Sequence, residues 1–226
     1  MKKKELLIFD MDGTLYDLKD VVNSNYEMQI SFLVEKTGRN REAVVASLEE
    51  NHIYPVMKKD SKSATEFFSR EGYDMQEWTN YRESRFNVSA IDVTKAVDND
   101  CIGRLAAQFK LVLLSSNSLK NIKRVLSHIG ISSSHFSTIV CSDTFAKDIQ
   151  FCKRAAMKDI SRAYGVPFKD MVSIGDRYMT DIQPILELGG CGILLVSPSS
   201  MKRVQEDLIC GKLKSCKEYE FYASFR

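Results

Sequence analysis

Short, continuous runs of apolar residues recur along the chain, and segments with helical spacing separate them. The runs do not alternate between apolar and polar positions, which is typical of strands buried on both faces of a parallel sheet. Because such strands alternate with helices, the pattern predicts an α/β fold with a doubly wound, Rossmann-like parallel sheet. The five predicted strands cover residues 6–9, 111–114, 138–141, 171–174 and 192–196.

The segments between the later strands carry the signature of amphipathic helices. In residues 122–129 the apolar side chains follow an i, i+3, i+4, i+7 spacing, and Gly130 comes where a helix would end. The same arrangement precedes Gly165 and Gly189. We expect the basic and aromatic tail, residues 212–226, to form a further strand or an ordered end.

Residues 10–110 separate the first predicted strand from the second, far more than a single crossover helix requires. Four helical patterns lie within this interval, and their apolar residues suffice for a small core of their own. We therefore expect an all-α cap domain inserted directly after the first strand. The predicted division is a cap at 18–93 and a Rossmann-like catalytic core formed by 1–17 and 94–226.

Composition narrows the possible partners. The 226 residues include 32 basic and 30 acidic side chains, a net charge of +2, whereas dedicated nucleic-acid binders carry a clear basic excess. No apolar run approaches the roughly 18 residues of a membrane span. The six cysteines contain no C-x-x-C pair. We expect a cytoplasmic protein that binds neither nucleic acid nor membrane, with an oligomeric state left open between monomer and weak dimer.

The first candidate for chemistry directly follows the first strand. Asp10 and Asp12 place two carboxylates two residues apart at the end of a buried strand, where their repulsion requires compensation. A divalent cation supplies it, and hard oxygen ligands favour Mg²⁺. Gly13 allows a sharp turn whose amides can face an anion. A polar turn with an Asx cap is the alternative interpretation.

Two further polar groups follow other predicted strands. Asp176 could complete a metal site with Asp10 if their strands are neighbours, and Asp181 would then orient a metal-bound water or a lysine. Ser115 ends the second strand before a helix, where a hydroxyl can hold a phosphate oxygen. Taken alone, Asp181 can also be read as a helix cap, and the Ser115 segment is read more readily as a plain Ser/Asn N-cap.

These motifs, in this order, resemble the haloacid dehalogenase-like superfamily, whose members are mostly Mg²⁺-dependent phosphohydrolases. The resemblance covers essentially the whole chain, and the predicted insertion resembles the small α-helical cap between the family's first and second motifs. It implies that Asp10 is the nucleophile and Asp12 the general acid and then base. It also implies that Asp10, Asp176 and the backbone carbonyl of Asp12 hold Mg²⁺, with Asp181 supporting them.

The phosphate-binding residues of the family are less easily placed. Spacing favours Ser115 as the second-motif hydroxyl, with Ser116 contributing its amide. The third-motif lysine is usually followed by proline, which this chain lacks. We predict Lys147, because a lysine leaving the loop after a strand can reach the sheet edge. Lys153, the alternative favoured by counting back from Gly165, reads as a solvated helix face.

The resemblance implies a phosphatase that hydrolyses a small phosphorylated metabolite, of the sugar phosphate or nucleotide class, through an aspartyl phosphate. Asp12 favours phosphate transfer, because dehalogenases proper usually lack this second aspartate. A phosphomutase and a non-catalytic, phosphate-dependent binding module remain as alternatives. Substrate identity is expected to depend on the cap, although each candidate there, taken singly, is read more readily as an ordinary surface or packing residue. These candidates are Tyr16, Asp17, Tyr54, Lys58, Arg82 and Arg85.

Overall fold

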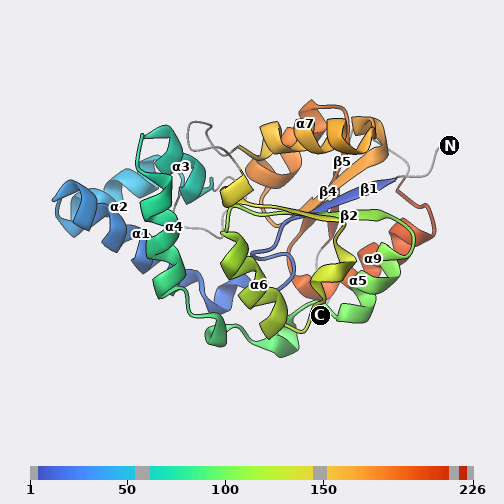
Figure 1. Cartoon of the computed structure of the whole chain (residues 1–226), viewed down its shortest axis with the longest axis horizontal. Helices are drawn as coiled ribbons and strands as arrows, with labels where there is room; N and C mark the ends of the chain where they lie inside the picture. Colours follow the sequence, from blue (N-terminus) through green and yellow to red (C-terminus); the bar gives the residue numbers. More distant parts are fainter. Residues whose placement is uncertain (1–4, 54–61, 145–151, 214–218, 223–226) are drawn as a thin grey trace.

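A six-stranded sheet forms the centre of the larger part of the molecule (Figure 1). The computed structural model describes residues 5–53, 62–144, 152–213 and 219–222. All strand pairings in the sheet are parallel, in the order β3-β2-β1-β4-β5-β6, as the doubly wound prediction requires. The strands are β1 (Leu6–Phe9), β2 (Lys110–Leu114), β3 (Thr138–Val140), β4 (Met171–Gly175), β5 (Cys191–Leu195) and β6 (Tyr219–Tyr222).

All five predicted strands are present, and the sixth lies in the tail. The order places β1 between β2 and β4, with Phe9 opposite Leu113 on one side and Ile174 on the other. The carboxyl ends of these three strands therefore meet at one edge of the sheet. In open parallel sheets, ligands bind at this edge, where the strand order reverses.

Helices cover both faces of the sheet. On β1, Leu7 and Phe9 pack toward α5 (Asn99–Ala106), α6 (Leu119–His128) and α9 (Met201–Ile209). Leu6 and Ile8 point to the opposite face and pack toward α7 (Lys153–Tyr164) and α8 (Gln183–Glu187). Figure 1 shows α7 on one side of the sheet and α5, α6 and α9 on the other. Because the strands are buried on both faces, their sequences are continuous apolar runs rather than alternating ones.

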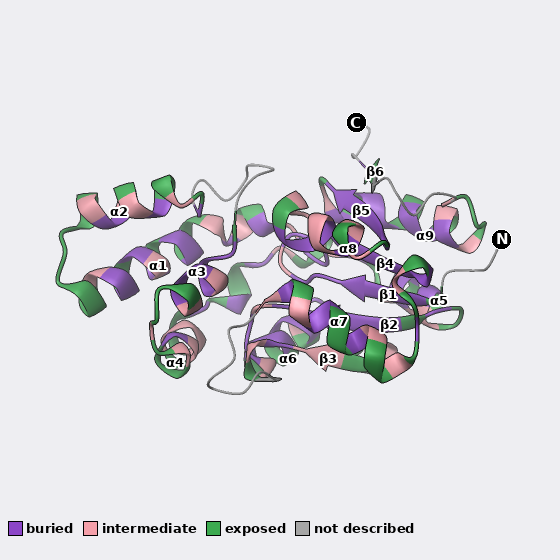
Figure 2. Ribbon diagram, turned by 90° about the horizontal axis from the view of Figure 1, so that it is seen from above, coloured by how far each residue is buried: buried purple, intermediate pink, exposed green. Residues whose placement is uncertain are grey.

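Four helices beyond the carboxyl end of β1 form a separate packed unit (Figure 2). Phe32 lies at its centre, with its ring centroid 5.4 Å from that of Phe68 and 5.0 Å from that of Trp78. We propose that this unit is the cap domain. Its helices are α1 (Val22–Thr37), α2 (Arg41–Glu50), α3 (Ala64–Arg70) and α4 (Met75–Arg85).

The segments on either side of the four helices pack differently. Leu18 and Val21, before α1, and Phe86, Val88 and Ile91, after α4, belong to the apolar cluster on the sheet. The helical unit therefore covers fewer residues than the predicted insertion at 18–93. The residues at both ends of that insertion pack on the core instead and anchor the unit to it. Across the described part of the chain, none of the helices combines the length and apolar character that a bilayer crossing demands.

Candidate active site

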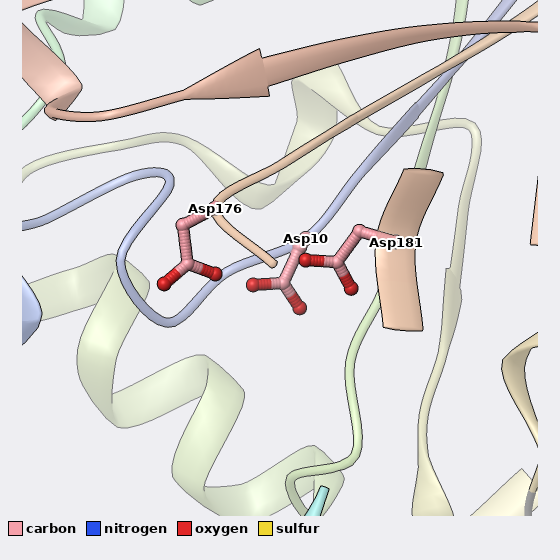
Figure 3. Close-up of side chains that lie close together, drawn as sticks. All are labelled: Asp10, Asp176 and Asp181. Atoms are coloured by element: carbon pink, nitrogen blue, oxygen red, sulfur yellow. The ribbon is translucent and has the colours of Figure 1, made fainter. Parts of the chain in front are cut away.

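Three aspartates from two neighbouring strand ends converge at the carboxyl edge of the sheet (Figure 3). Asp10 follows β1, Asp176 follows β4, and Asp181 lies in the π-helical turn Tyr178–Ile182. Their closest carboxylate oxygens all lie within 4.8 Å of one another. The Asp10 amide donates to the Ile174 carbonyl at 2.9 Å, which continues the pairing of β1 with β4 into the site. The structure thus brings Asp10 and Asp176 together as the strand order requires.

A buried lysine joins two of these aspartates. Lys153 Nζ lies 2.6 Å from Asp10 Oδ1 and 2.7 Å from Asp181 Oδ1. Lys153 is the first residue of α7, which packs on the sheet with its N-terminus at the carboxyl edge. The interpretation of Lys153 as a solvated helix face is therefore wrong, since only 6% of the residue is exposed. Lys147, the predicted third-motif lysine, lies outside the described residues.

The electrostatics of the cluster favour an additional cation. Burial raises the pKa of Asp10 to about 7, although the Lys153 ammonium opposes the shift and Asp181 adds to it. Burial also raises the pKa of Asp176 well above its ordinary value, against the attraction of Arg177. Burial alone would lower the pKa of Lys153, but the carboxylates of Asp10 and Asp181 outweigh it and raise that pKa.

The ligand chemistry of the cluster fits a hard divalent cation. Asp176 Oδ1 is buried and has no hydrogen-bond partner within the described residues. Asp181 is otherwise occupied: its Oδ1 accepts from Lys153 and Thr180, and its Oδ2 accepts from the Arg177 amide at 3.0 Å. Asp10 and Asp176 are therefore the side chains best placed to hold a metal, while Asp181 fixes Lys153. Oxygen-only ligands suit Mg²⁺.

Two glycines make this convergence possible. Gly13 has φ +85°, and a Cβ atom on it would lie 2.3 Å from Asp176 Oδ2. A Cβ atom on Gly175 would lie 2.4 Å from the Cβ of Asp181. The chain therefore needs glycine at both positions for the acidic side chains to approach the backbone of β4 and of the turn after β1 so closely.

Asp12 points toward the cap rather than into the acidic cluster. The Tyr16 hydroxyl donates to Asp12 Oδ1 at 2.6 Å. Arg82 Nη2, from α4 of the cap, donates to Asp12 Oδ2 at 3.2 Å, and Asn117 Nδ2 donates to the same oxygen at 3.4 Å. The carboxylate is thus held between cap and core, separately from the three converging aspartates.

The two predicted phosphate-binding serines differ in their surroundings. Ser115 is almost fully buried, and its Oγ accepts from the Asn117 amide at 3.2 Å. Ser116 lines a cavity of about 30 Å³ next to the aspartates, and its carbonyl accepts from Arg82. Ser115 is not among the residues that line this cavity. The cavity is lined by Asp10, Asp12, Ser63, Ser116, Lys153, Arg177, Thr180 and Asp181.

Contacts between cap and core surround the cavity. The Lys153 amide donates to Glu66 Oε1 on α3 at 3.3 Å, and Arg177 Nη1 donates to the Lys62 carbonyl at 3.4 Å. Together with the contact between Arg82 and Asp12, these bonds hold the four cap helices over the carboxyl edge of the sheet. The cavity in this arrangement lies between the two parts of the molecule.

Sequence reasoning placed some of these residues and missed others. Arg82 was a cap candidate and reaches the site, whereas Arg85 lies over the Tyr81 ring, 3.6 Å from its centroid, and is half exposed. Tyr54 and Lys58 lie outside the described residues. Arg177 and Ser63 were not predicted. Arg177 lies directly after Asp176, and this position could have suggested a role. Ser63 reaches the cavity only through the packing of α3.

Solved structures with a similar fold cover between 84% and 96% of the chain. β-Phosphoglucomutase from Clostridium difficile aligns with a TM-score of 0.56 at 17% identity, covering 94% of this chain and 100% of that chain. A HAD phosphatase from Thermococcus onnurineus aligns at 0.53 and 15% identity, covering 84% and 86%. L-2-haloacid dehalogenase from Xanthobacter autotrophicus aligns at 0.52 and 13% identity, covering 96% and 86%. At these identities the likeness concerns the fold alone.

Sequence comparison gives the family directly. No curated protein matches the chain. The sequence profile of the haloacid dehalogenase-like hydrolases matches residues 4–189, which include all four aspartates, the cap helices and Lys153. Together with the parallel sheet and the acidic cluster at its carboxyl edge, this match shows that the chain belongs to the haloacid dehalogenase-like hydrolase family.

Proposed function

We propose that the protein is a Mg²⁺-dependent phosphatase that cleaves a small phosphorylated metabolite through an aspartyl phosphate on Asp10. The observation that carries this proposal is the position of Asp10. Its carboxylate lies against the buried ammonium of Lys153 and beside Asp176, whose Oδ1 has no partner among the described residues. A carboxylate nucleophile that attacks a dianionic phosphate requires cationic partners of this kind.

The chain's own residues supply each remaining part of the reaction. Lys153 holds Asp10 Oδ1, so the other carboxylate oxygen is the one that attacks phosphorus. A bond forms between this oxygen and phosphorus as the bond from phosphorus to the leaving oxygen breaks, and Asp12 protonates the leaving alkoxide. Asp12 then removes a proton from water as water attacks the phosphorus, which releases phosphate and restores Asp10.

Asp10, Asp176 and the backbone of Asp12 would hold the metal. Bound there, Mg²⁺ would neutralise phosphoryl oxygens and lower the repulsion between substrate and nucleophile. Asp12 supports phosphate transfer over halide displacement, because an alkoxide leaving group requires a proton whereas a halide does not. Its contact with Arg82 of α4 supports this role, because the leaving group would lie on the side of the cap.

A panel of phosphate esters, including an aryl phosphate, tests the proposal when assayed with Mg²⁺ and again with a chelator. We expect turnover that depends on Mg²⁺, and we expect Asp10→Asn to lower kcat by about 10³-fold or more. Asp159→Asn, on the exposed face of α7, is the matched control and should retain activity. Turnover of 2-haloacids, or full activity of Asp10→Asn on a phosphate ester, would overturn the proposal.

A further inference from the structure

Two residues of the cap that line a second cavity carry buried side-chain carbonyl oxygens. Asn25 Oδ1 and Gln29 Oε1 both lack a partner within the described residues, and only 8% of Asn25 is exposed. The two residues are four apart on α1 and therefore share one face of the helix. Both line a cavity of about 50 Å³ between cap and core.

This second cavity adjoins the candidate active site. Asp12, Ser63, Ser116 and Arg177 line it as well as the cavity beside the aspartates. A phosphoryl group seated next to Asp10 would direct its organic portion past Asp12 into the space below α1. The amides of Asn25 and Gln29 would then face the leaving group rather than the phosphate.

Two arginines line this space, and each already donates to an oxygen of the chain; Arg177 Nη1 donates to the Lys62 carbonyl at 3.4 Å. Arg82 lines it, but its guanidinium donates to Asp12 Oδ2 and to the Ser116 carbonyl. Trp78, also at the wall, donates its indole N–H to Thr65 Oγ1 at 3.3 Å. Among the described residues that line this space, Asn25 and Gln29 are the ones that carry a buried side-chain oxygen without a partner. A hydroxyl group both donates and accepts hydrogen bonds, so it can pair with either amide in both of its orientations.

A buried polar group is nearly always hydrogen-bonded, so two orphan acceptors on one face of α1 indicate a ligand with hydrogen-bond donors. The size of the cavity limits that ligand. A cavity of about 150 Å³ admits benzene, whereas this one is about a third as large. With the cap in this position, the space suits a short hydroxylated group.

We propose that Asn25 and Gln29 form a leaving-group subsite that accepts hydrogen bonds from hydroxyl groups of a short polyol or sugar phosphate. This assignment rests on the proposed phosphatase activity, and it narrows the substrate class to hydroxylated esters. A site built to bind a hydroxyl group discriminates strongly against an analogue that lacks it, because the buried acceptors are then left unpaired.

Glycerol 1-phosphate and propyl phosphate provide a matched pair of probes with the same phosphate and the same number of carbons. We expect the wild-type protein with Mg²⁺ to favour glycerol 1-phosphate in kcat/KM by about tenfold or more. Asn25→Leu and Gln29→Met should bring this ratio close to one. Gln29 is less buried than Asn25, so Gln29→Met keeps the test available if Asn25→Leu does not fold.

Asn23→Leu is the control, because it makes the same substitution on an exposed position of α1 and should leave the ratio unchanged. A ratio near one in the wild-type protein, or a ratio that Asn25→Leu and Gln29→Met do not alter, would overturn the subsite. If no phosphate ester is hydrolysed, the proposed function fails instead. In that case, the affinities of the Asp10→Asn variant for the two esters, measured by calorimetry, test the subsite without turnover. Equal affinities or no binding would refute the subsite.

Discussion

The Arg82 guanidinium, on the last helix of the cap, lies 3.2 Å from the carboxylate of Asp12, 70 residues earlier in the chain. Both side chains are largely buried, with 11% and 14% of their surfaces exposed. Arg82 also donates to the Ser116 carbonyl at 3.3 Å. One side chain of the cap therefore contacts both the proposed acid–base residue and the loop after β2. The closed position of the cap and the position of Asp12 depend on the same contact.

Arg82→Met should lower kcat/KM by about 10- to 100-fold, because Asp12 loses its cationic partner and the cap loses a contact with the core. Steady-state kinetics on an aryl phosphate measure this effect. Arg85→Met is the matched control on the same helix, where the ion pair with Glu35 is half exposed and 3.7 Å long. Exposed pairs contribute little, so this variant should stay within about twofold of the wild type. Equal losses in the two variants would contradict a specific role for Arg82.

The assignment of the third-motif lysine leads to a second prediction. Lys153→Met should lower kcat by about 10³-fold or more, since Asp10 and Asp181 then face each other without the ammonium between them. Lys147→Met tests the residue that the sequence favoured and should retain activity within about threefold. Lys158→Met, on the exposed face of α7, controls for loss of charge on the helix. A large loss in Lys147→Met together with an active Lys153→Met would reverse the assignment.

Metal binding should depend on pH, because protons and the cation compete for the same carboxylates. The pKa of Asp10 in the metal-free fold is about 7, above its ordinary value of 3.8. The folded state therefore binds this proton more tightly than the unfolded state. The contribution of this group to stability is fully present below 3.8 and is lost as the pH rises through about 7.

A cation replaces that proton, so Mg²⁺ should stabilise the protein most where Asp10 is ionised. We expect the increase in Tm on addition of Mg²⁺ to be several degrees larger at about pH 8 than at about pH 5.5. Thermal unfolding followed by circular dichroism measures both values. Asp176→Asn should abolish the increase at each pH. An increase that does not vary with pH would show that the cluster titrates outside this range or that the metal binds elsewhere.

The sequence was sufficient to predict the site residues whose positions depend on the sheet. Asp10 and Asp176 directly follow continuous apolar runs, and the parallel pairing of β1 with β4 carries both to one edge. Asp181 follows from its short spacing after Asp176. These positions depend on local sequence and on strand order, both of which are readable from the chain.

The residues placed by packing between elements could not be predicted in the same way. Lys153 begins α7 directly at the acidic cluster, but periodicity does not fix where a helix starts, and the missing proline removed the usual marker. Asn25 and Gln29 reach the second cavity only because the cap helices fold over the sheet. Polar residues on a helix read as solvated until the opposing surface is known.

Comparing Gly13 with Gly72 separates backbone strain from a steric clash with a neighbouring side chain. Gly13→Ala introduces strain at φ +85° and also places a methyl group against Asp176, 2.3 Å from Oδ2. Gly72→Ala introduces the same kind of strain at φ +82°, with nothing within 4 Å of the new methyl group. Each variant should lose about 1 kcal/mol of stability from the left-handed backbone.

Only Gly13→Ala should also lose the stabilisation by Mg²⁺, because Asp176 cannot keep its position beside Asp10 once the methyl group occupies that space. Chemical denaturation with and without Mg²⁺ measures both quantities for each variant. A Gly13→Ala protein that responds to Mg²⁺ like the wild type would show that Asp176 can hold the metal from another position. The close approach of Gly13 to Asp176 would then be a packing feature rather than a requirement of the metal site.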